Sequence, residues 1–341
     1  MYKNVDGTNY VEGVHYDLIR LSSGKLTKVG FENKRNLGGR VDMHIHSTSS
    51  DGTLNPDEII RLALMSNVST LAITDHDTLL GSKRMMRKNH RGLEIYTGIE
   101  LSALVRSGKS RIHILGYDFD VNNEEINKAV EFVDKCSEYN FKLYIRCLEE
   151  RFPEIKIPKE DIEQVLEKRR RTGKNIGRVD ICRILIEHGY GEDNDHEFPE
   201  EYTKQDVVFE KYLNPVKYQV QAEKLGITEE ECIQIIKAAG GLVCLAHPSS
   251  LRLNDHDLEE RIVEYKEMGL DGIEVYHPNN TEAQRQYYYE LAKKHGLLIS
   301  GGTDYHGFEV KPNIILGHGR DGNIDLRQED LSLVKKLRKR H

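Results

Sequence analysis

Two histidines one residue apart, His44 and His46, are followed closely by Asp51 in the segment RVDMHIHSTSSDGT, residues 40–53. In a β-strand, side chains two residues apart point to the same face. Two imidazoles on one face of a strand either bind a common metal ion or lie side by side at the surface. The residues at the other predicted strand ends distinguish between these two interpretations.

Metal-competent side chains recur where other predicted strands end. Each of them alone is explained by a helix cap, a turn or a buried polar group, but their repeated position at strand ends is not. The candidate ligands are six histidines and three carboxylates: His44, His46, Asp51, His76, Glu100, His113, His247, Asp304 and His306.

These ligand types indicate the metal and its chemistry. Imidazole and carboxylate without thiolate suit zinc, manganese or iron(II). The candidate ligands are too many for one ion that keeps an open position, so we predict two or three divalent ions. Clustered divalent ions, roughly 3.5–4 Å apart, activate a water and stabilise the oxygens of a displacement at phosphorus.

Short apolar runs alternate with helical patterns and must position these ligands. The first run leads to Asn55-Pro56-Asp57-Glu58, a helix start with an Asn cap and Pro in the first turn. The alternation predicts a parallel α/β architecture, either a barrel or an open sheet. In a (β/α) barrel the carboxyl ends of the strands meet on one face. The predicted strands lie at 40–45, 69–74, 93–101, 111–117, 241–247, 271–277 and 296–302.

Two regions differ from this alternation. Residues 121–225 show amphipathic helical patterns near 123–150, 158–171 and 175–189, so we predict a helical insertion between the fourth and fifth strands. Residues 1–39 form an N-terminal extension with a predicted β-hairpin around Ser22–Lys25. The flanking parts, 40–120 and 226–341, supply the predicted strands.

Composition limits the classes of protein. The chain has 341 residues and a formal net charge of −7, which argues against broad adhesion to nucleic acid or membranes. Its five scattered cysteines form no CxxC pair and fit free thiols in a reducing compartment. No segment resembles a membrane span or a signal peptide, so we expect a cytoplasmic protein.

The motifs, taken together and in order, resemble the PHP superfamily, named for polymerase and histidinol phosphatase. They are HIHSTSSDGTLNP, LAITDHDTLLG, GIELS, HILGY, GGLVCLAHP, IEVYHP and GGTDYHG. The resemblance covers about 40–120 and 225–310 and is greatest to stand-alone phosphoesterases that act on nucleotides. It implies an α/β fold, a distorted seven-stranded (β/α) barrel with a helical insertion.

The resemblance also implies how the ligands divide among three sites. His44, His46, Glu100 and Asp304 would form the first site. Glu100 would bridge to a second ion held by His113 and His247. Asp51, His76 and His306 would form the third, where some family members have His in place of Asp51.

Two further residues are predicted to act on the substrate. In NIGRVDICRILIEHG (175–189), Arg178 matches a family arginine near the substrate phosphate, but Asp180 stands where relatives have His. A planar guanidinium binds phosphate oxygens bidentately. His277, at the sixth strand end, would orient the substrate, protonate the leaving group or support a metal ligand.

The sequence thus predicts a phosphoesterase that hydrolyses small nucleotide-like or sugar phosphates through a metal-bridged hydroxide, with two or three Mn, Fe or Zn ions. Its expected partners are small phosphorylated substrates and short oligonucleotides, without a membrane or a stable nucleic-acid complex. The alternatives are a 5′→3′ exonuclease on short RNA or DNA, a histidinol phosphate phosphatase, and a catalytically inactive metal-binding regulatory module. The last would be expected to lack ligands, and all the candidates are present.

Overall fold

The computed structural model describes residues 3–4, 9–11, 14–21, 23–31, 39–86, 92–104, 111–172, 176–192, 196–199 and 202–341. The chain divides into two compact units. The first comprises Met1–Ala103, Arg111–Ala129 and Thr228–His341, and the second comprises Leu104–Ser110 and Val130–Ile227.

The strands of the described residues form three sheets. They are β1 (Lys3–Asn4), β2 (Asn9–Val11), β3 (Val14–Arg20), β4 (Leu26–Phe31), β5 (Arg40–Ile45), β6 (Val68–Ile73), β7 (Glu94–Leu104), β8 (Arg111–Tyr117), β9 (Ile227–Thr228), β10 (Leu242–Leu245), β11 (Gly272–Tyr276), β12 (Leu298–Gly301), β13 (Ile314–Ile315) and β14 (Gly319–Arg320). The largest sheet has the order β12-β11-β10-β8-β7-β6-β5, with β9 beside β7.

Helices separate most of these strands. They are α1 (Pro56–Met65), α2 (Leu80–Met86), α3 (Glu124–Arg151), α4 (Lys159–Thr172), α5 (Arg178–Glu187), α6 (Lys204–Val208), the π-helix η1 (Phe209–Leu213), α7 (Lys217–Glu223), α8 (Glu229–Ala238), the 3₁₀ helix η2 (Pro248–Leu251), α9 (Asp255–Met268), α10 (Glu282–His295) and α11 (Ser332–Arg338). Within the described ranges, none of them has the length and apolar character that crossing a membrane requires.

The predicted parallel arrangement is wrong at one strand, because the large sheet is mixed. β5, β6 and β7 are parallel to one another, as are β10, β11 and β12. β8 pairs antiparallel with β10, with Leu242 opposite Tyr117 and Leu245 opposite Ile114. Six residues separate β7 from its neighbour β8, and a parallel crossover needs about a dozen or more. The short connection therefore excludes a parallel β8.

A buried carboxylate joins the two end strands of the large sheet. Asp42 in β5 accepts hydrogen bonds from the backbone N (2.9 Å) and Oγ1 (2.6 Å) of Thr303, which follows β12. It also accepts one from the backbone N of Gly317 at 2.9 Å. Ile45 and Tyr305 form an isolated parallel bridge beside this contact. The carboxyl ends of β5 and β12 therefore lie together.

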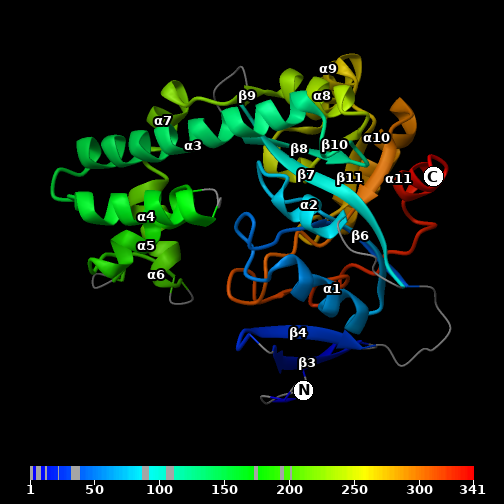
Figure 1. Ribbon diagram of the computed structural model, residues 1–341, viewed down its shortest axis with the longest axis horizontal. Coiled ribbons are helices and arrows are strands. Elements are labelled where there is room, and N and C mark those ends of the chain that lie inside the picture. Colours follow the sequence, from blue (N-terminus) through cyan, green and yellow to red (C-terminus); the bar gives the residue numbers. More distant parts are fainter. Residues whose placement is uncertain are drawn as a thin grey trace. The chain divides into compact units, whose positions relative to one another are not determined.

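The first helix begins as the sequence predicts. The Asn55 side chain accepts from the backbone N of Glu58 at 3.1 Å, and the Glu58 carboxylate accepts from the backbone N of Asn55 at 2.9 Å. This capping box and Pro56 confirm the predicted start. Figure 1 shows α1 between β4 and β6, where Ile59 and Leu62 are buried in one apolar cluster with Val29 of β4.

The second unit is helical in its described part and has its own apolar core. α3, α4, α5 and α6 contribute to it, with buried residues that include Phe141, Leu148, Ile181 and Leu185. Close packing of these side chains, rather than polar contacts, provides its interior.

Candidate metal centre

The candidate ligands of the first unit meet at the carboxyl ends of its parallel strands. His44 lies in β5, His46 directly follows it, and Glu100 lies in β7. His113 is the third residue of β8. Because β8 is antiparallel to β10, its beginning lies beside the end of β10, which places His113 next to His247. The strand direction that the sequence analysis missed is therefore what brings His113 to the centre.

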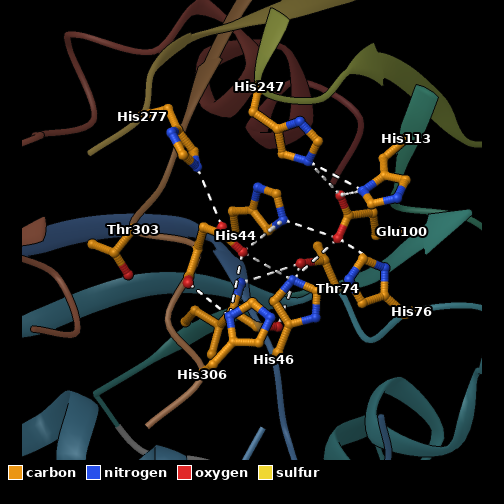
Figure 2. A network of polar contacts seen from close by, with 12 residues as sticks. His44, His46, Thr74, His76, Glu100, His113, His247, His277, Thr303 and His306 are labelled. Carbon is orange, nitrogen blue, oxygen red and sulfur yellow. Dashed lines mark hydrogen bonds and ion pairs between the residues drawn. The ribbon is translucent and has the colours of Figure 1, made fainter. Parts of the chain in front are cut away.

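Glu100 lies in the middle of this arrangement, with five imidazoles around its carboxylate (Figure 2). Oε2 is 3.2 Å from His44 Nε2, 3.1 Å from His46 Nε2 and 3.2 Å from His76 Nδ1. Oε1 is 2.9 Å from His113 Nδ1 and 3.0 Å from His247 Nε2. Each carboxylate oxygen thus faces its own group of ring nitrogens.

These distances fit atoms that share metal ions. Two ligands of one ion, each about 2.1 Å from it, lie roughly 3.0–3.4 Å apart. Both ring nitrogens of His46 and Nε2 of His113 are buried and make no hydrogen bond of suitable geometry among the described residues, although His46 Nε2 lies beside the Glu100 carboxylate. The centre therefore has the ligand chemistry and the spacing that suit divalent metal ions.

Eight of the nine candidate ligands have atoms that fall into three overlapping groups. His46, Asp51, His76 and His306 form one, His44, His46 and Asp304 another, and His76, Glu100 and His113 a third, with the atoms of each group within 4.8 Å of one another. His46 and His76 each take part in two of these groups, and the expected division of the ligands among three sites stays a prediction.

Neighbouring groups fix the orientation of three imidazoles. His44 Nδ1 lies 2.8 Å from Glu274 Oε1, His247 Nδ1 lies 2.8 Å from Ser250 Oγ, and His306 Nδ1 donates to the backbone O of Asp304 at 2.8 Å. In each ring Nε2 faces the centre, near Glu100 or Asp51. Such partners hold a histidine in the orientation that metal binding requires.

Glu274 was not among the predicted site residues. It is fully buried in β11, and its second oxygen accepts from the backbone N of His247 at 2.7 Å. One carboxylate therefore positions two candidate ligands, His44 and His247. The signal in the sequence was a Glu within the apolar strand DGIEVYH, where an ionised side chain is costly without partners.

The charges of the carboxylates and imidazoles in the centre depend strongly on one another. Burial opposes the ionised form of Glu100, but His76, His44 and His113 outweigh it and hold the pKa of the Glu100 carboxyl well below its usual range. Burial likewise opposes imidazolium at His44, yet Glu274 and Glu100 raise the pKa of His44 well above its usual value. Divalent ions would supply the positive charge that these carboxylates require while the imidazoles stay neutral.

Two candidate ligands have an uncommon backbone conformation. His247 has φ of 25° and Asp304 has φ of 50°. Such conformations cost residues other than glycine roughly 1–3 kcal/mol, and they occur most often at functional sites. The surrounding hydrogen bonds of Glu274 and of Asp42 with Thr303 support these two turns.

The loop after His46 is held by another buried carboxylate. Asp75 accepts from the backbone N and Oγ of Ser47, each at 2.7 Å, and from Ser50 Oγ at 2.8 Å. A Cβ at Gly52 would lie 2.3 Å from the backbone O of His46, so this close approach needs glycine. The loop thereby brings Asp51 Oδ1 to 3.5 Å from His46 Nδ1 and 3.4 Å from His306 Nε2.

His277 lies at the edge of the centre. It contacts one of the candidate ligands, Asp304. Its Nε2 is 3.3 Å from Asp304 Oδ2, and its Nδ1 accepts from the backbone N of Asn279 at 3.2 Å. This contact places the ring proton on Nε2 in the neutral imidazole. The arrangement leaves His277 able to donate to Asp304.

Arg178 and Asp180 belong to the second unit. The Arg178 guanidinium lies 5.3 Å from the centre of the Phe209 ring and 3.5 Å from Asn214 Oδ1. Asp180 accepts from the backbone N of Gly177 at 3.0 Å and lies 3.4 Å from Arg183. The carboxylate that replaces the expected histidine therefore caps the start of α5.

The fold and the centre define an α/β protein whose clustered histidines and carboxylates suit divalent metal ions. The PHP domain family matches residues 42–268, about two thirds of the chain, so the chain belongs to this family. It is a metal-dependent phosphoesterase, a hydrolase of phosphate esters.

Relatives of several named activities are similar to this chain. A 5′-3′ exoribonuclease of Haemophilus influenzae is 29% identical over 78% of this chain and 90% of the relative. A phosphoribosyl 1,2-cyclic phosphate 1,2-diphosphodiesterase of Eggerthella lenta is 27% identical over 78% and 94%. A 3′,5′-nucleoside bisphosphate phosphatase of Chromobacterium violaceum is 26% identical over 78% and 87%.

Two solved structures are similar over most of their length. An amidohydrolase from Chromobacterium violaceum with bound sulfate has a TM-score of 0.69 and 25% identity, covering 89% of this chain and 97% of that chain. A protein from Bifidobacterium adolescentis assigned as a metal-dependent phosphoesterase has a TM-score of 0.61 and 28% identity, covering 83% and 93%.

Proposed function

We propose that this phosphoesterase hydrolyses small nucleotide-like or sugar phosphates at a cluster of two or three divalent ions. The observation that carries the proposal is the Glu100 carboxylate, whose two oxygens face separate groups of imidazoles at 2.9–3.2 Å. Bound divalent ions activate water at neutral pH and neutralise charge on phosphate oxygens. The nine expected ligands, His44, His46, Asp51, His76, Glu100, His113, His247, Asp304 and His306, would hold them.

The protein contributes groups of its own to this reaction. Glu274, Ser250 and the backbone of Asp304 hold imidazoles in place before substrate binds, which reduces reorganisation in the transition state. His277 carries its proton on Nε2 toward Asp304. We propose that it orients the substrate or transfers a proton to the leaving group.

A phosphate-release screen tests the proposal. The probes are nucleotides, cyclic phosphates, histidinol phosphate and short oligonucleotides, with added Mn²⁺ and with a chelator as the contrast. We expect release from a small nucleotide or sugar phosphate, lost on chelation and restored by Mn²⁺. No release from any probe, by a protein that holds at least two ions per chain, would contradict it.

Metal content needs its own control, because an exposed group on α9 could also bind an ion. His256, Asp257 and Glu260 place their ligand atoms within 4.8 Å of one another. Asp257→Asn should leave metal content and activity unchanged by elemental analysis and kinetics. A loss of metal in this variant would assign the ion to the surface rather than to the centre.

A 5′→3′ exonuclease is the second candidate, favoured by the relatives from Haemophilus influenzae and Escherichia coli that are named 5′-3′ exoribonucleases. Product analysis distinguishes it. An exonuclease releases nucleotides stepwise from a 5′-phosphorylated oligonucleotide, whereas a small-molecule phosphatase releases inorganic phosphate from nucleotides. Faster turnover of the oligonucleotide would replace the first proposal by the second.

The expected role of Arg178 at the substrate phosphate stays a prediction. Arg178→Ala should lower kcat/KM for phosphomonoesters roughly tenfold to hundredfold, the contribution of a charge-assisted contact. Metal content should not change. Arg151→Ala is a matched control, since Arg151 also lies over a phenylalanine ring, at 5.8 Å from Phe152. Equal kinetics for both variants would remove Arg178 from catalysis.

We also infer that the large sheet closes as the distorted seven-stranded barrel of the family. Asp42 with Thr303, and the bridge between Ile45 and Tyr305, support closure between the first and last strands. Closure would bring the carboxyl ends of the parallel strands, together with the beginning of β8, to one face, where active sites of (β/α) barrels lie.

A further inference from the structure

One group of candidate ligands, the Asp51 group (His46, Asp51, His76 and His306), takes a ligand from a loop. His46 directly follows β5, and its ring lies against that of His306, with 4.1 Å between the ring centres (Figure 2). Asp51 lies instead in the loop between His46 and α1, and 44% of its side chain is exposed. The position of this loop therefore decides whether Asp51 can share an ion with the imidazoles.

The loop that carries Asp51 and the segment that carries His306 contact each other directly. The backbone N of Thr53 donates to the backbone O of His306 at 2.8 Å. Gly307 has φ of 96°, and a Cβ at this position would lie 1.8 Å from Thr53 Oγ1. The two segments are packed together so closely that a displacement of one should displace the other.

Lys25, which directly precedes β4, holds the loop of Asp51 from outside the centre. Its ammonium donates to the backbone O of Thr53 and lies 3.5 Å from the Glu58 carboxylate at the start of α1. One lysine thus joins the end of the loop to the first turn of the helix that follows it. A charged donor makes a stronger hydrogen bond to a carbonyl than a neutral donor does, so this contact should restrict the loop.

Thr27 of β4 holds the segment of His306. Its Oγ1 lies 2.8 Å from the Tyr305 hydroxyl, and both side chains are buried. Tyr305 directly precedes His306, and its backbone O accepts from the backbone N of His46 at 2.8 Å. A buried hydroxyl that loses its only partner is costly, so the contact between Thr27 and Tyr305 should fix this segment beside β5.

β4 is held in place without the ligands and lies outside the match to the PHP domain family, which begins at residue 42. It pairs antiparallel with β3. Val29 of β4 is fully buried in the apolar cluster that also contains Leu54 and Tyr305. The strand can therefore position the loop before an ion binds, which reduces the cost of ordering the site.

We propose that Lys25 and Thr27 are positioning residues for the ion of the Asp51 group, so that β4 sets the affinity of one ion of the cluster. The proposal rests on the proposed function, which places divalent ions among these ligands. When a loop holds its ligand in place for only part of the time, the apparent dissociation constant rises in inverse proportion to that fraction. Without the contacts of Lys25 and Thr27, Asp51 is in place less often, whereas the ligands on β5 and β7 keep their positions.

Titration of the metal-free protein with Mn²⁺ tests this, with free Mn²⁺ measured by its electron paramagnetic resonance signal. Asp51→Asn should raise the dissociation constant of one ion and so identify the ion of the Asp51 group. Lys25→Met and Thr27→Val should each raise the constant of one ion about tenfold, as loss of an outer partner of a metal ligand does, and leave the others unchanged. Asp51→Asn combined with Lys25→Met should add no further loss, because both changes act on the same ion.

Rescue and a matched control separate positioning from general stability. Lys25→Arg and Thr27→Ser keep the charged donor and the hydroxyl and should restore wild-type binding. Lys237→Met should leave all constants unchanged, since Lys237 also pairs with a carboxylate, 2.9 Å from Asp271, but lies on α8 of the same unit. Circular dichroism of the metal-free protein checks folding. Lys25 is 31% exposed, so Lys25→Met keeps the test valid if Thr27→Val does not fold.

Three results would overturn the proposal: unchanged Mn²⁺ binding in Lys25→Met, an equal loss for all ions, or an Asp51→Asn variant that binds Mn²⁺ as the wild type does. The proposed function can fail separately, because the titration contains no substrate. A wild type that hydrolyses no phosphate ester, but binds one Mn²⁺ more weakly after Lys25→Met, would refute the proposed function and support this inference. Hydrolysis by a protein whose Mn²⁺ binding is independent of Lys25 would do the reverse.

Discussion

The interior of the first unit and that of the second differ in kind. The metal centre buries ionisable groups in contact with one another, with Glu100 and His44 almost completely inaccessible to solvent. The core of the second unit consists of apolar side chains such as Phe141, Leu148 and Ile181. An ion pair of this unit, between Lys142 and Glu138, lies at the exposed surface.

This difference separates the groups that stabilise the protein from those that serve its chemistry. Apolar burial stabilises roughly in proportion to the area removed from water. Burying charges costs several kcal/mol per ion unless partners compensate. The second unit can therefore fold without a ligand, whereas the centre of the first unit should gain stability from bound metal.

The largest expected effect comes from Glu100→Ala. It removes the carboxylate shared by two groups of imidazoles, so metal content and phosphatase activity should both fall to background. Elemental analysis and phosphate release measure the two losses. Glu124→Ala, at an exposed position of α3, is the control. Full metal content in Glu100→Ala would contradict the bridging role.

A substitution in the apolar core of the second unit should lower stability and leave metal content unchanged. Leu148→Ala creates a cavity in a fully buried position and should lower the free energy of unfolding of that unit by about 2–5 kcal/mol. Denaturant unfolding measures this loss, while the metal content of the folded protein should not change. Leu225→Ala, 46% exposed in the same unit, should cost little. Loss of metal in Leu148→Ala would show that the two interiors are not independent.

Glu274→Gln should affect metal affinity without removing a ligand. Supporting partners of metal-bound histidines contribute roughly tenfold to hundredfold in affinity. Competition of the protein with a chromogenic chelator gives the dissociation constant directly. Glu267→Gln, exposed on α9, should show wild-type affinity. An unchanged constant in Glu274→Gln would mean that backbone packing alone orients His44 and His247.

A smaller, pH-dependent effect is expected at His318, a buried imidazole outside the centre. Burial, with Arg40 and Arg327 nearby, lowers the pKa of His318 to about 3. Because the unfolded chain has an ordinary histidine pKa near 6.5, protons bind preferentially to the unfolded state. Stability from this residue is therefore complete above about pH 6.5 and is lost toward about pH 3, by at most about 1.4 kcal/mol per pH unit.

His318→Gln tests this by unfolding at several pH values. The difference in unfolding free energy between wild type and variant should shrink as pH falls from about 7 to 5. A difference that is constant over this range would show that His318 is not held neutral. The pKa of His318 would then not differ in direction from that of His44, which its carboxylate neighbours raise.

Much of the centre could be predicted from sequence, because the alternation of apolar runs and helices is a local property. Strand ends could be recognised, and metal-competent side chains stood at most of them, whereas His113 lies near the beginning of its strand. The start of α1 at Asn55 followed from its capping residues alone. His46 and Asp51 were recognised as candidate ligands because only a short turn separates them in the sequence.

Other features depend on residues distant in the sequence. The antiparallel direction of β8 could have been found from the six residues before it, yet its neighbour β10 follows only after the insertion. The sequence around Lys311 did not indicate that it lies at the centre, because its contact with Asp304 forms only in the folded structure. The hydrogen bond of Arg320 with Asn279 likewise joins residues 41 positions apart.

The sequence by itself determined which residue types stand at the strand ends and which helices begin where, because hydrophobic period and capping act over a few residues. Only the tertiary structure decided how the ligands group around Glu100 and which carboxylates orient them. Hydrogen bonds such as that between His44 and Glu274 join residues 230 positions apart, and a carboxylate has no fixed role until folding decides which donors surround it.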